Sequence, residues 1–130
     1  MLAKSEYFET FGGGFLIDKQ PFRVSYVLDL KPLKTLPSTT WVIVSFENPR
    51  GGPPIIMEQA MTLKDGRLIL ESKPIKGLQS HHDYQVQVSI YADSSKATLL
   101  GTHTQLIQSG ISQDNVERLI PLSERYEPSR

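Results

Sequence analysis

Apolar and polar side chains alternate along much of the chain, and the clearest run starts at Phe22. Val24 and Tyr26 stand between mostly polar neighbours, and residues 84–91 show the same alternation. Successive side chains of a β-strand point to opposite faces of the sheet, so this period of two predicts strands with one buried face. After a turn, residues 98–109 predict the antiparallel partner of the strand at 84–91.

The middle of the chain predicts three more strands. Residues 40–46 (TWVIVSF) are β-branched and aromatic, which is typical of a central strand. The segment 48–54 (NPRGGPP) then interrupts the pattern, because three prolines and two glycines prevent a regular ladder. Residues 55–74 predict a hairpin, and Asp65-Gly66 suits the positive φ angles of its tight turn.

The two ends of the chain are less regular. Three consecutive glycines at 12–14 indicate a flexible joint, a bulge or the close approach of another backbone. They precede an apolar run and do not open a helix, so they do not predict a phosphate-binding loop. Residues 112–120 predict a short helical turn that Pro121 ends. We therefore predict one domain over 1–130, with a core at about 15–111 and peripheral arms at 1–14 and 112–130.

The segment 77–91 (GLQSHHDYQVQVSIY) resembles a known group of folds. Its leucine, tyrosine and alternating valines are similar to the penultimate strand of fibronectin type III and immunoglobulin-like domains; they are Leu78, Tyr84, Val86 and Val88. The resemblance implies an all-β fold, an immunoglobulin-like antiparallel β-sandwich of about seven strands. It also implies that Tyr84 forms a tyrosine corner and that Trp41 is the buried tryptophan of the third strand. The chain lacks the cysteine pair of such domains, and the resemblance assigns no functional residue, because these folds host many activities.

Composition excludes several classes of function. The chain has no cysteine, which rules out thiol catalysis, zinc–thiolate sites and iron–sulfur clusters. Its 14 basic and 14 acidic residues form no long run of one sign, so we expect neither nucleic-acid nor membrane binding. The first residues contain no apolar run of signal-peptide length. We therefore expect a cytoplasmic protein if Met1 is the native start, and an exported one if the chain has been trimmed.

His81, His82 and Asp83 are the most conspicuous candidates for chemistry. Adjacent residues at the start of a strand usually point apart, so a metal site would need a further ligand from elsewhere. His103 is the candidate, because its strand is expected to pair with 84–91 and to place it near Val86. The alternative is a polar surface corner in which Asp83 accepts backbone hydrogen bonds, and we favour that alternative and predict no metal and no cofactor.

Other catalytic arrangements find little support in the sequence. A serine nucleophile on a tight turn would show a G-x-S-x-G motif, and none occurs. Glu47 and Glu58 flank the loop at 48–54, but nothing in the pattern brings two carboxylates into one cleft. We therefore predict that the protein is not an enzyme.

The candidates for binding are the proline-rich loop and one tyrosine. Prolines stiffen the loop, and Arg50 with Pro53 and Pro54 would lose little entropy on docking. The competing interpretation is a plain connection that protects sheet edges. Tyr91 falls on the polar side of its strand and is expected to be exposed, whereas Trp41 is expected in the core.

These observations predict a non-catalytic binding or assembly module. Its expected partner is another protein, which includes a second copy of the chain, and strand addition at a sheet edge is the simplest route of contact. Two alternatives stay open. A carbohydrate-binding module would require exposed aromatic side chains, and a small metal-dependent enzyme would require His81 or His82 to converge with His103.

Overall fold

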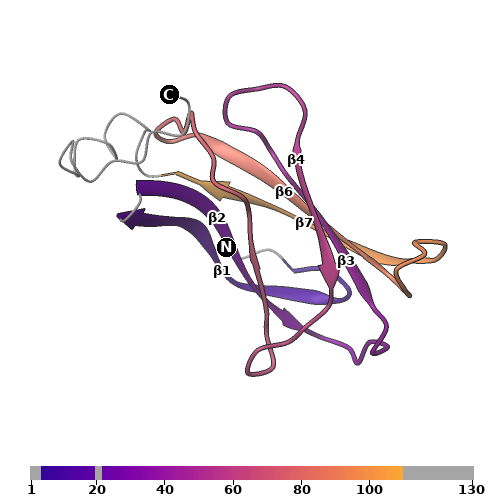
Figure 1. The fold of residues 1–130 in the computed structure, drawn as a ribbon. Helices are drawn as coiled ribbons and strands as arrows, with labels where there is room; N and C mark the ends of the chain where they lie inside the picture. Colours follow the sequence, from indigo (N-terminus) through magenta and orange to yellow (C-terminus); the bar gives the residue numbers. More distant parts are fainter. Residues whose placement is uncertain (1–3, 20–21, 110–130) are drawn as a thin grey trace.

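The computed structural model describes residues 4–19 and 22–109, which form seven β-strands in two antiparallel sheets (Figure 1). One sheet has the order β1-β2-β5, with β1 at Phe8–Lys19, β2 at Phe22–Pro32 and β5 at Leu68–Glu71. The other has the order β4-β3-β6-β7, with β4 at Ile55–Ala60, β3 at Trp41–Phe46, β6 at Asp83–Tyr91 and β7 at Leu99–Gln108. This confirms the predicted all-β sandwich of about seven strands. The described part of the chain contains no helix that is long and apolar enough to cross a membrane.

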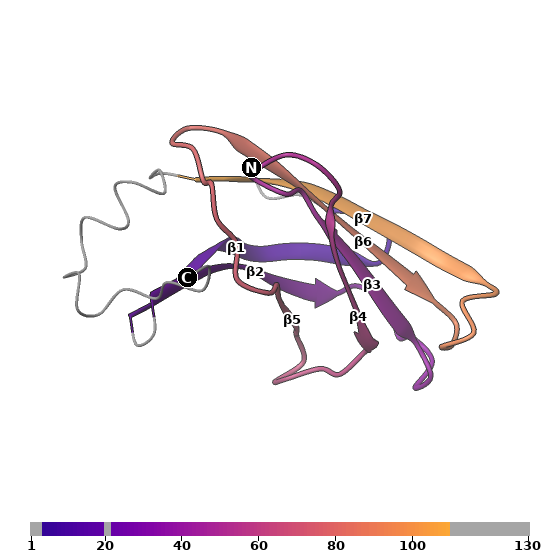
Figure 2. The same cartoon turned by 45° about the horizontal axis from the view of Figure 1, so that its top comes forward.

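The core lies between the two sheets, which form separate layers in Figure 2. Every second residue of the inner strands is buried there, as the alternation in the sequence predicts. Tyr26 is the centre of an aromatic group: its ring stacks on Phe46 at 5.0 Å and meets Tyr84 edge-on at 6.4 Å. Aromatic pairs of this geometry each add about 0.5–1.5 kcal/mol beyond the area that they bury. The hydroxyls of Tyr26 and Tyr84 also form hydrogen bonds. The Tyr26 hydroxyl donates to the Glu47 carbonyl (2.6 Å), and the Tyr84 hydroxyl accepts from the Gln79 N–H (2.7 Å).

The first strand starts earlier than predicted. Residues 1–14 were expected to form a peripheral arm, but β1 begins at Phe8 and runs through the three glycines, with a bulge between Thr10 and Gly12. Phe8 is 1% exposed and belongs to the core. Gly13 has a packing role, because a Cβ atom there would lie 3.0 Å from the Gln105 side chain and 3.3 Å from that of Leu28. The predicted helical turn and the arm at 112–130 lie outside the described residues.

The predicted hairpin at 55–74 is wrong, although its turn exists. Asp65 (φ 52°) and Gly66 (φ 78°) do adopt positive φ angles between the paired residues Lys64 and Arg67. Beyond that single pair the two strands separate, because β4 pairs with β3 in one sheet and β5 pairs with β2 in the other. Leu68 and Leu70 of β5 gain more by lying in the core opposite Leu30 and Leu28 than by pairing with an edge strand.

Candidate functional site

The outer face of the four-stranded sheet carries two aromatic side chains, few charges and a pocket. Cross-strand register places Trp41 between Ala60 and Tyr91, and Ser45 opposite Gln87. Directly opposite residues of antiparallel strands share a face, so the register defines this surface. We call it the β4-β3-β6-β7 face; it consists of Ile56, Glu58, Ala60, Trp41, Ile43, Ser45, Gln85, Gln87, Ser89, Tyr91, Leu99, Thr102, Thr104 and Leu106.

This sheet carries far less charge than the other one. In β4, β3, β6 and β7 the only charged residues are Glu58 and Asp83, which begins β6 at one end of the sheet. By contrast, β1, β2 and β5 contain seven: Glu9, Asp18, Lys19, Arg23, Asp29, Lys31 and Glu71. Even the exposed Phe11 of that second sheet lies under cations, with the Arg67 guanidinium 5.0 Å and the Lys31 amine 5.6 Å from its ring centre. The two outer surfaces of the sandwich are therefore chemically different.

Trp41 lies on the β4-β3-β6-β7 face, and the expectation that it packs in the core is wrong. It begins β3, where the next residue, Val42, points inward and is fully buried. Trp41 is therefore half-buried, and its indole Nε1 donates to Glu58 Oε1 at 3.0 Å. Lys96 Nζ lies 3.5 Å from the same oxygen, so the Glu58 carboxylate on the edge strand β4 has one cationic neighbour. Tyr91 is the cross-strand neighbour of Trp41 and is also half-buried.

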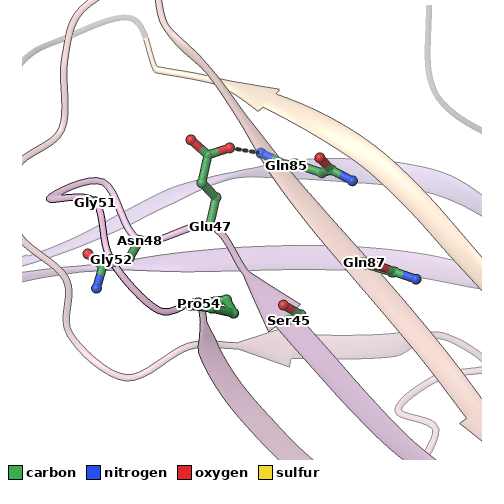
Figure 3. Close-up of a pocket in the computed structure, with 8 residues that line it drawn as sticks. All are labelled: Ser45, Glu47, Asn48, Gly51, Gly52, Pro54, Gln85 and Gln87. Atoms are coloured by element: carbon green, nitrogen blue, oxygen red, sulfur yellow. Dashed lines mark hydrogen bonds between the residues drawn. The ribbon is translucent and has the colours of Figure 1, made fainter.

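A shallow, open pocket of about 440 Å³ lies at the opposite end of the same face (Figure 3). Sheet residues and the loop at 48–54 form its walls; the lining consists of Ser45, Glu47, Asn48, Gly51, Gly52, Pro54, Gln85 and Gln87. Glu47 is held in place, because its Oε1 accepts the Gln85 N–H at 2.9 Å and its Oε2 lies 3.6 Å from His82 Nε2. Amides and hydroxyls otherwise dominate the lining, so the pocket offers hydrogen bonds and little charge.

The loop at 48–54 is ordered by Asn48. Asn48 Oδ1 accepts the Arg50 N–H at 3.0 Å, and the Asn48 carbonyl accepts the Gly51 N–H at 2.9 Å. Gly51 and Gly52 follow with φ of 83° and 85°, a conformation that favours glycine. The Arg50 side chain lies against Gly77, where a Cβ atom would be 2.7 Å from Arg50 Cγ.

The predicted binding residues thus fall into separate places. Pro53 and Pro54 are exposed, and Pro54 lines the pocket. Arg50 is exposed, contacts the loop before β6 at Gly77 and is not part of the pocket lining. Tyr91 lies at the other end of β6, four residues from Gln87, which corresponds to roughly 13 Å at the rise of a β-strand. Pro54 and Tyr91 therefore lie at opposite ends of one sheet surface and not in one pocket.

The three histidines do not converge. His81 (φ 59°) and His82 are exposed in the turn before β6. His103 lies opposite Val88, two residues further along β6 than the predicted partner Val86, and its side chain is 1% exposed between the sheets. Among residues 4–19 and 22–109 no group of three or more His, Asp and Glu side chains is arranged to hold a metal ion.

His103 instead belongs to a buried polar cluster that joins β7 to the start of β1. Thr10 Oγ1 lies 2.9 Å from His103 Nε2 and donates to Gln105 Oε1 at 2.6 Å, while Nε2 lies 3.1 Å from that same oxygen. Because Gln105 Oε1 can only accept, Nε2 carries the ring proton. Nδ1 then accepts from the Ser5 hydroxyl at 2.8 Å, so both nitrogens of a neutral imidazole have partners. Burial lowers the pKa of His103, and a hydrogen bond with Gln105 opposes that effect in part.

Comparison with known proteins adds only a distant structural likeness. No family model matches the chain, and no curated protein matches it. Three solved structures of Bacteroides uniformis β-glucuronidase are similar over 78% of this chain, which spans only 12–13% of their length. A calcium-binding mutant of β-glucuronidase 2 matches with 15% identity and a TM-score of 0.48, and the enzyme bound covalently to cyclophellitol-6-carboxylate aziridine with 16% and 0.48. These comparisons show no family.

The β4-β3-β6-β7 face was missed at the level of sequence. Its signal was present, because residues 84–91 and 99–108 contain no Asp, Glu, Lys or Arg in a chain with 22% charged residues. The signal has meaning only once β6 and β7 are known to lie side by side with β3 and β4, and that arrangement comes from the sheet topology.

Proposed function

We propose that this chain is a non-catalytic binding module that contacts another protein through the β4-β3-β6-β7 face. The observation that carries the proposal is the difference in charge between the two outer surfaces of the sandwich. One has charges of both signs on β1 and β2 and Glu71 on β5, whereas the other has Glu58 alone between its ends. The expected partner surface is likewise uncharged.

The reason is the cost of removing charge from water. A charge buried in an interface without a partner costs several kcal/mol, so the centres of protein interfaces are depleted in charged residues and enriched in aromatic ones. The β4-β3-β6-β7 face has both properties, with Trp41 and Tyr91 side by side. It also includes the three most exposed large apolar side chains of the described residues; these are Ile56 (49%), Leu99 (53%) and Leu106 (61%).

The module is, in this proposal, an immunoglobulin-like sandwich of the fibronectin type III kind. The division into sheets of three and four antiparallel strands supports this assignment. The bond from the Gln79 N–H to the Tyr84 hydroxyl supports it further, because a tyrosine at the start of the penultimate strand that binds backbone a few residues upstream is the tyrosine corner of such domains. Trp41 departs from the immunoglobulin pattern, since it is on the outer face.

Binding of a neutral carbohydrate is the second candidate, and one observation favours it. Trp41 and Tyr91 are adjacent, half-buried aromatic side chains on the same face as the amide-lined and hydroxyl-lined pocket. Aromatic rings pack against apolar sugar faces, and amides bond to their hydroxyls. The pocket itself contains no aromatic residue and lies at the far end of the face, so we place this candidate second.

A pair of lysine substitutions tests the protein-binding proposal. Gln87→Lys places a charge in the middle of the β4-β3-β6-β7 face, and Ile69→Lys places the same charge on the outer side of β5. Immobilised native and variant chains are compared for the proteins that they retain from extracts of the source cells, with quantification by mass spectrometry. We expect Gln87→Lys to reduce retention of the native chain's partner about tenfold or more, because the lysine loses its hydration in the contact. Ile69→Lys should retain it fully.

Two outcomes would count against this function. Equal retention by the native chain and Gln87→Lys would show that the face is not the contact. The second outcome is that the native chain retains no protein but binds a neutral glycan on an array, and that Tyr91→Ala loses this binding. That result would favour carbohydrate binding by the same face.

A further inference from the structure

The two sheets have four edge strands, and three of them carry features that discourage pairing with another chain. An edge strand presents unpaired N–H and C=O groups, which proteins protect with bulges, charges or short strands. β1 is interrupted by its bulge and has three consecutive glycines. β5 is only four residues long and ends in Glu71. β4 is regular, but Glu58 lies at the middle of its outer edge.

The fourth edge, β7, has no such protection. Its ten residues contain no proline and no Asp, Glu, Lys or Arg. Its ladder with β6 has one irregularity, between Ile90 and Tyr91, and from Gly101 to Gln108 the register is regular. Thr102, Thr104 and Leu106 are exposed along this regular part, and Leu106 is 61% exposed. A long, uncharged edge of this kind is a template for another strand.

Backbone hydrogen bonds show which groups of β7 have no partner among the described strands. The Glu47 N–H donates to the Gln85 carbonyl at 2.9 Å, so Gln85 and every second residue after it face β3. Val86 and Val88 therefore face β7, where they pair with Gln105 and His103. The alternate residues of β7 must direct their N–H and C=O groups away from β6; these are Thr102, Thr104, Leu106 and Gln108. No described strand pairs with this outer edge.

We infer that a second copy of the chain adds to this edge, with the two β7 strands antiparallel about a two-fold axis. An isologous contact sets each residue against its own symmetry mate or a near neighbour, so a strand with charges of one sign at its centre repels itself. Pairing of two β4 edges would bring the two Glu58 residues together. Pairing of two β7 edges brings no charge against any other.

The outward-facing N–H and C=O groups determine the register in which the two β7 strands pair. With the two-fold axis at Gln105, Thr102 lies opposite Gln108 of the second copy and Thr104 opposite Leu106, so all outward N–H and C=O groups find partners. The inward side chains of His103, Gln105 and Ile107 are buried in their own sandwich and do not obstruct the approach. Leu106, the most exposed leucine of the described residues, becomes covered by Thr104 of the second copy. The two four-stranded sheets then form one continuous sheet.

This inference rests on the proposed function, because it names one protein partner, but it concerns the edge and not the centre of the face. The two ideas therefore separate experimentally. Gln87 lies on β6, one strand away from the edge. Gln87→Lys should reduce capture of a heterologous partner about tenfold or more and leave self-association intact, whereas a change in the outward backbone of β7 should weaken self-association and leave that capture intact.

Thr104→Pro is the most direct variant for the edge. It removes an outward N–H and leaves the bonds between β6 and β7 in place, which an edge strand tolerates. Ala60→Pro is the matched control, because Met61 N–H donates to Thr40 and Ala60 therefore faces outward on the β4 edge of the same sheet. Leu106→Lys is a second test variant that keeps all backbone donors and introduces like charges near the two-fold axis.

Sedimentation velocity of the full chain between about 5 and 500 µM measures the outcome. We expect the native chain and Ala60→Pro to shift with concentration from 14.6 kDa toward twice that mass. Thr104→Pro should stay monomeric with a native circular dichroism spectrum, and Leu106→Lys should weaken association at least about tenfold. A native chain that is monomeric at every concentration would overturn the inference. So would self-association of Leu106→Lys that is as strong as that of the native chain.

Discussion

Replacing Phe8 by alanine is expected to lower the free energy of unfolding by about 3–5 kcal/mol, the range for a fully buried phenylalanine. Phe8 is 1% exposed, packs in the core and meets the His103 ring edge-on at 6.1 Å between centres. The effect is large because the Phe8 side chain fills the core where β1 and β7, edge strands of the two sheets, contact each other. Urea denaturation followed by fluorescence measures the change.

Phe11→Ala is the matched control for this variant. Phe11 lies in the same strand only three residues later, but it is 45% exposed on the outer side of the sheet. We expect its replacement to cost less than about 1 kcal/mol, because little apolar surface returns to water. Equal effects of the two substitutions would show that the start of β1 is not part of the core and would restore the peripheral arm that the sequence predicted.

Acidification is expected to destabilise the fold through His103. Burial lowers the pKa of this imidazole in the folded state. A base with a lowered folded pKa stabilises the fold fully above its unfolded pKa, here about 6.5, and loses that contribution as the pH falls below this value. The free energy of unfolding of the native chain should therefore decline between pH 7 and pH 5. The protonated ring would also need Ser5 to reverse its hydroxyl, since Nδ1 accepts from Ser5 at neutral pH.

His103→Gln should remove this part of the pH dependence, because glutamine does not titrate and can still bond within the cluster. Phe11→Ala serves as the control and should keep the native slope, because it removes an exposed side chain that has no titratable group. Denaturant titrations at four or five pH values between 5 and 8 give the slopes. A native slope that persists in His103→Gln would assign the acid sensitivity to other groups.

The sequence predicted what depends on local periodicity. Alternation at 22–30 and 84–91 identified strands and their buried faces, and Tyr84 is buried with its hydroxyl bonded to the Gln79 N–H. The turn at Asp65-Gly66 was also correct, because positive φ angles are a property of two residues. Which sheet each flanking strand joins is a property of distant partners, so the hairpin failed.

The candidate site was harder to predict for the same reason. Trp41 was assigned to the core because the resemblance to immunoglobulin-like domains makes it the buried tryptophan of the third strand. Its position in β3, next to the inward-facing Val42, instead places it on the outer face with Glu58 and Tyr91. Phe8 was placed in an arm because three glycines separate it from the next apolar run, although the strand continues through them. The charge-poor face became visible only when four strands, among them the neighbours β3 and β6 that are distant in sequence, were aligned side by side.

Amide hydrogen exchange on the chain with and without its captured partner would locate the contact. We expect slower exchange in β3, β6 and β7, the strands that form most of the β4-β3-β6-β7 face, and unchanged exchange in β1, β2 and β5. Protection confined to residues 8–32 and 68–71 would place the contact on the charged surface of the sandwich and show that the β4-β3-β6-β7 face does not bind the partner.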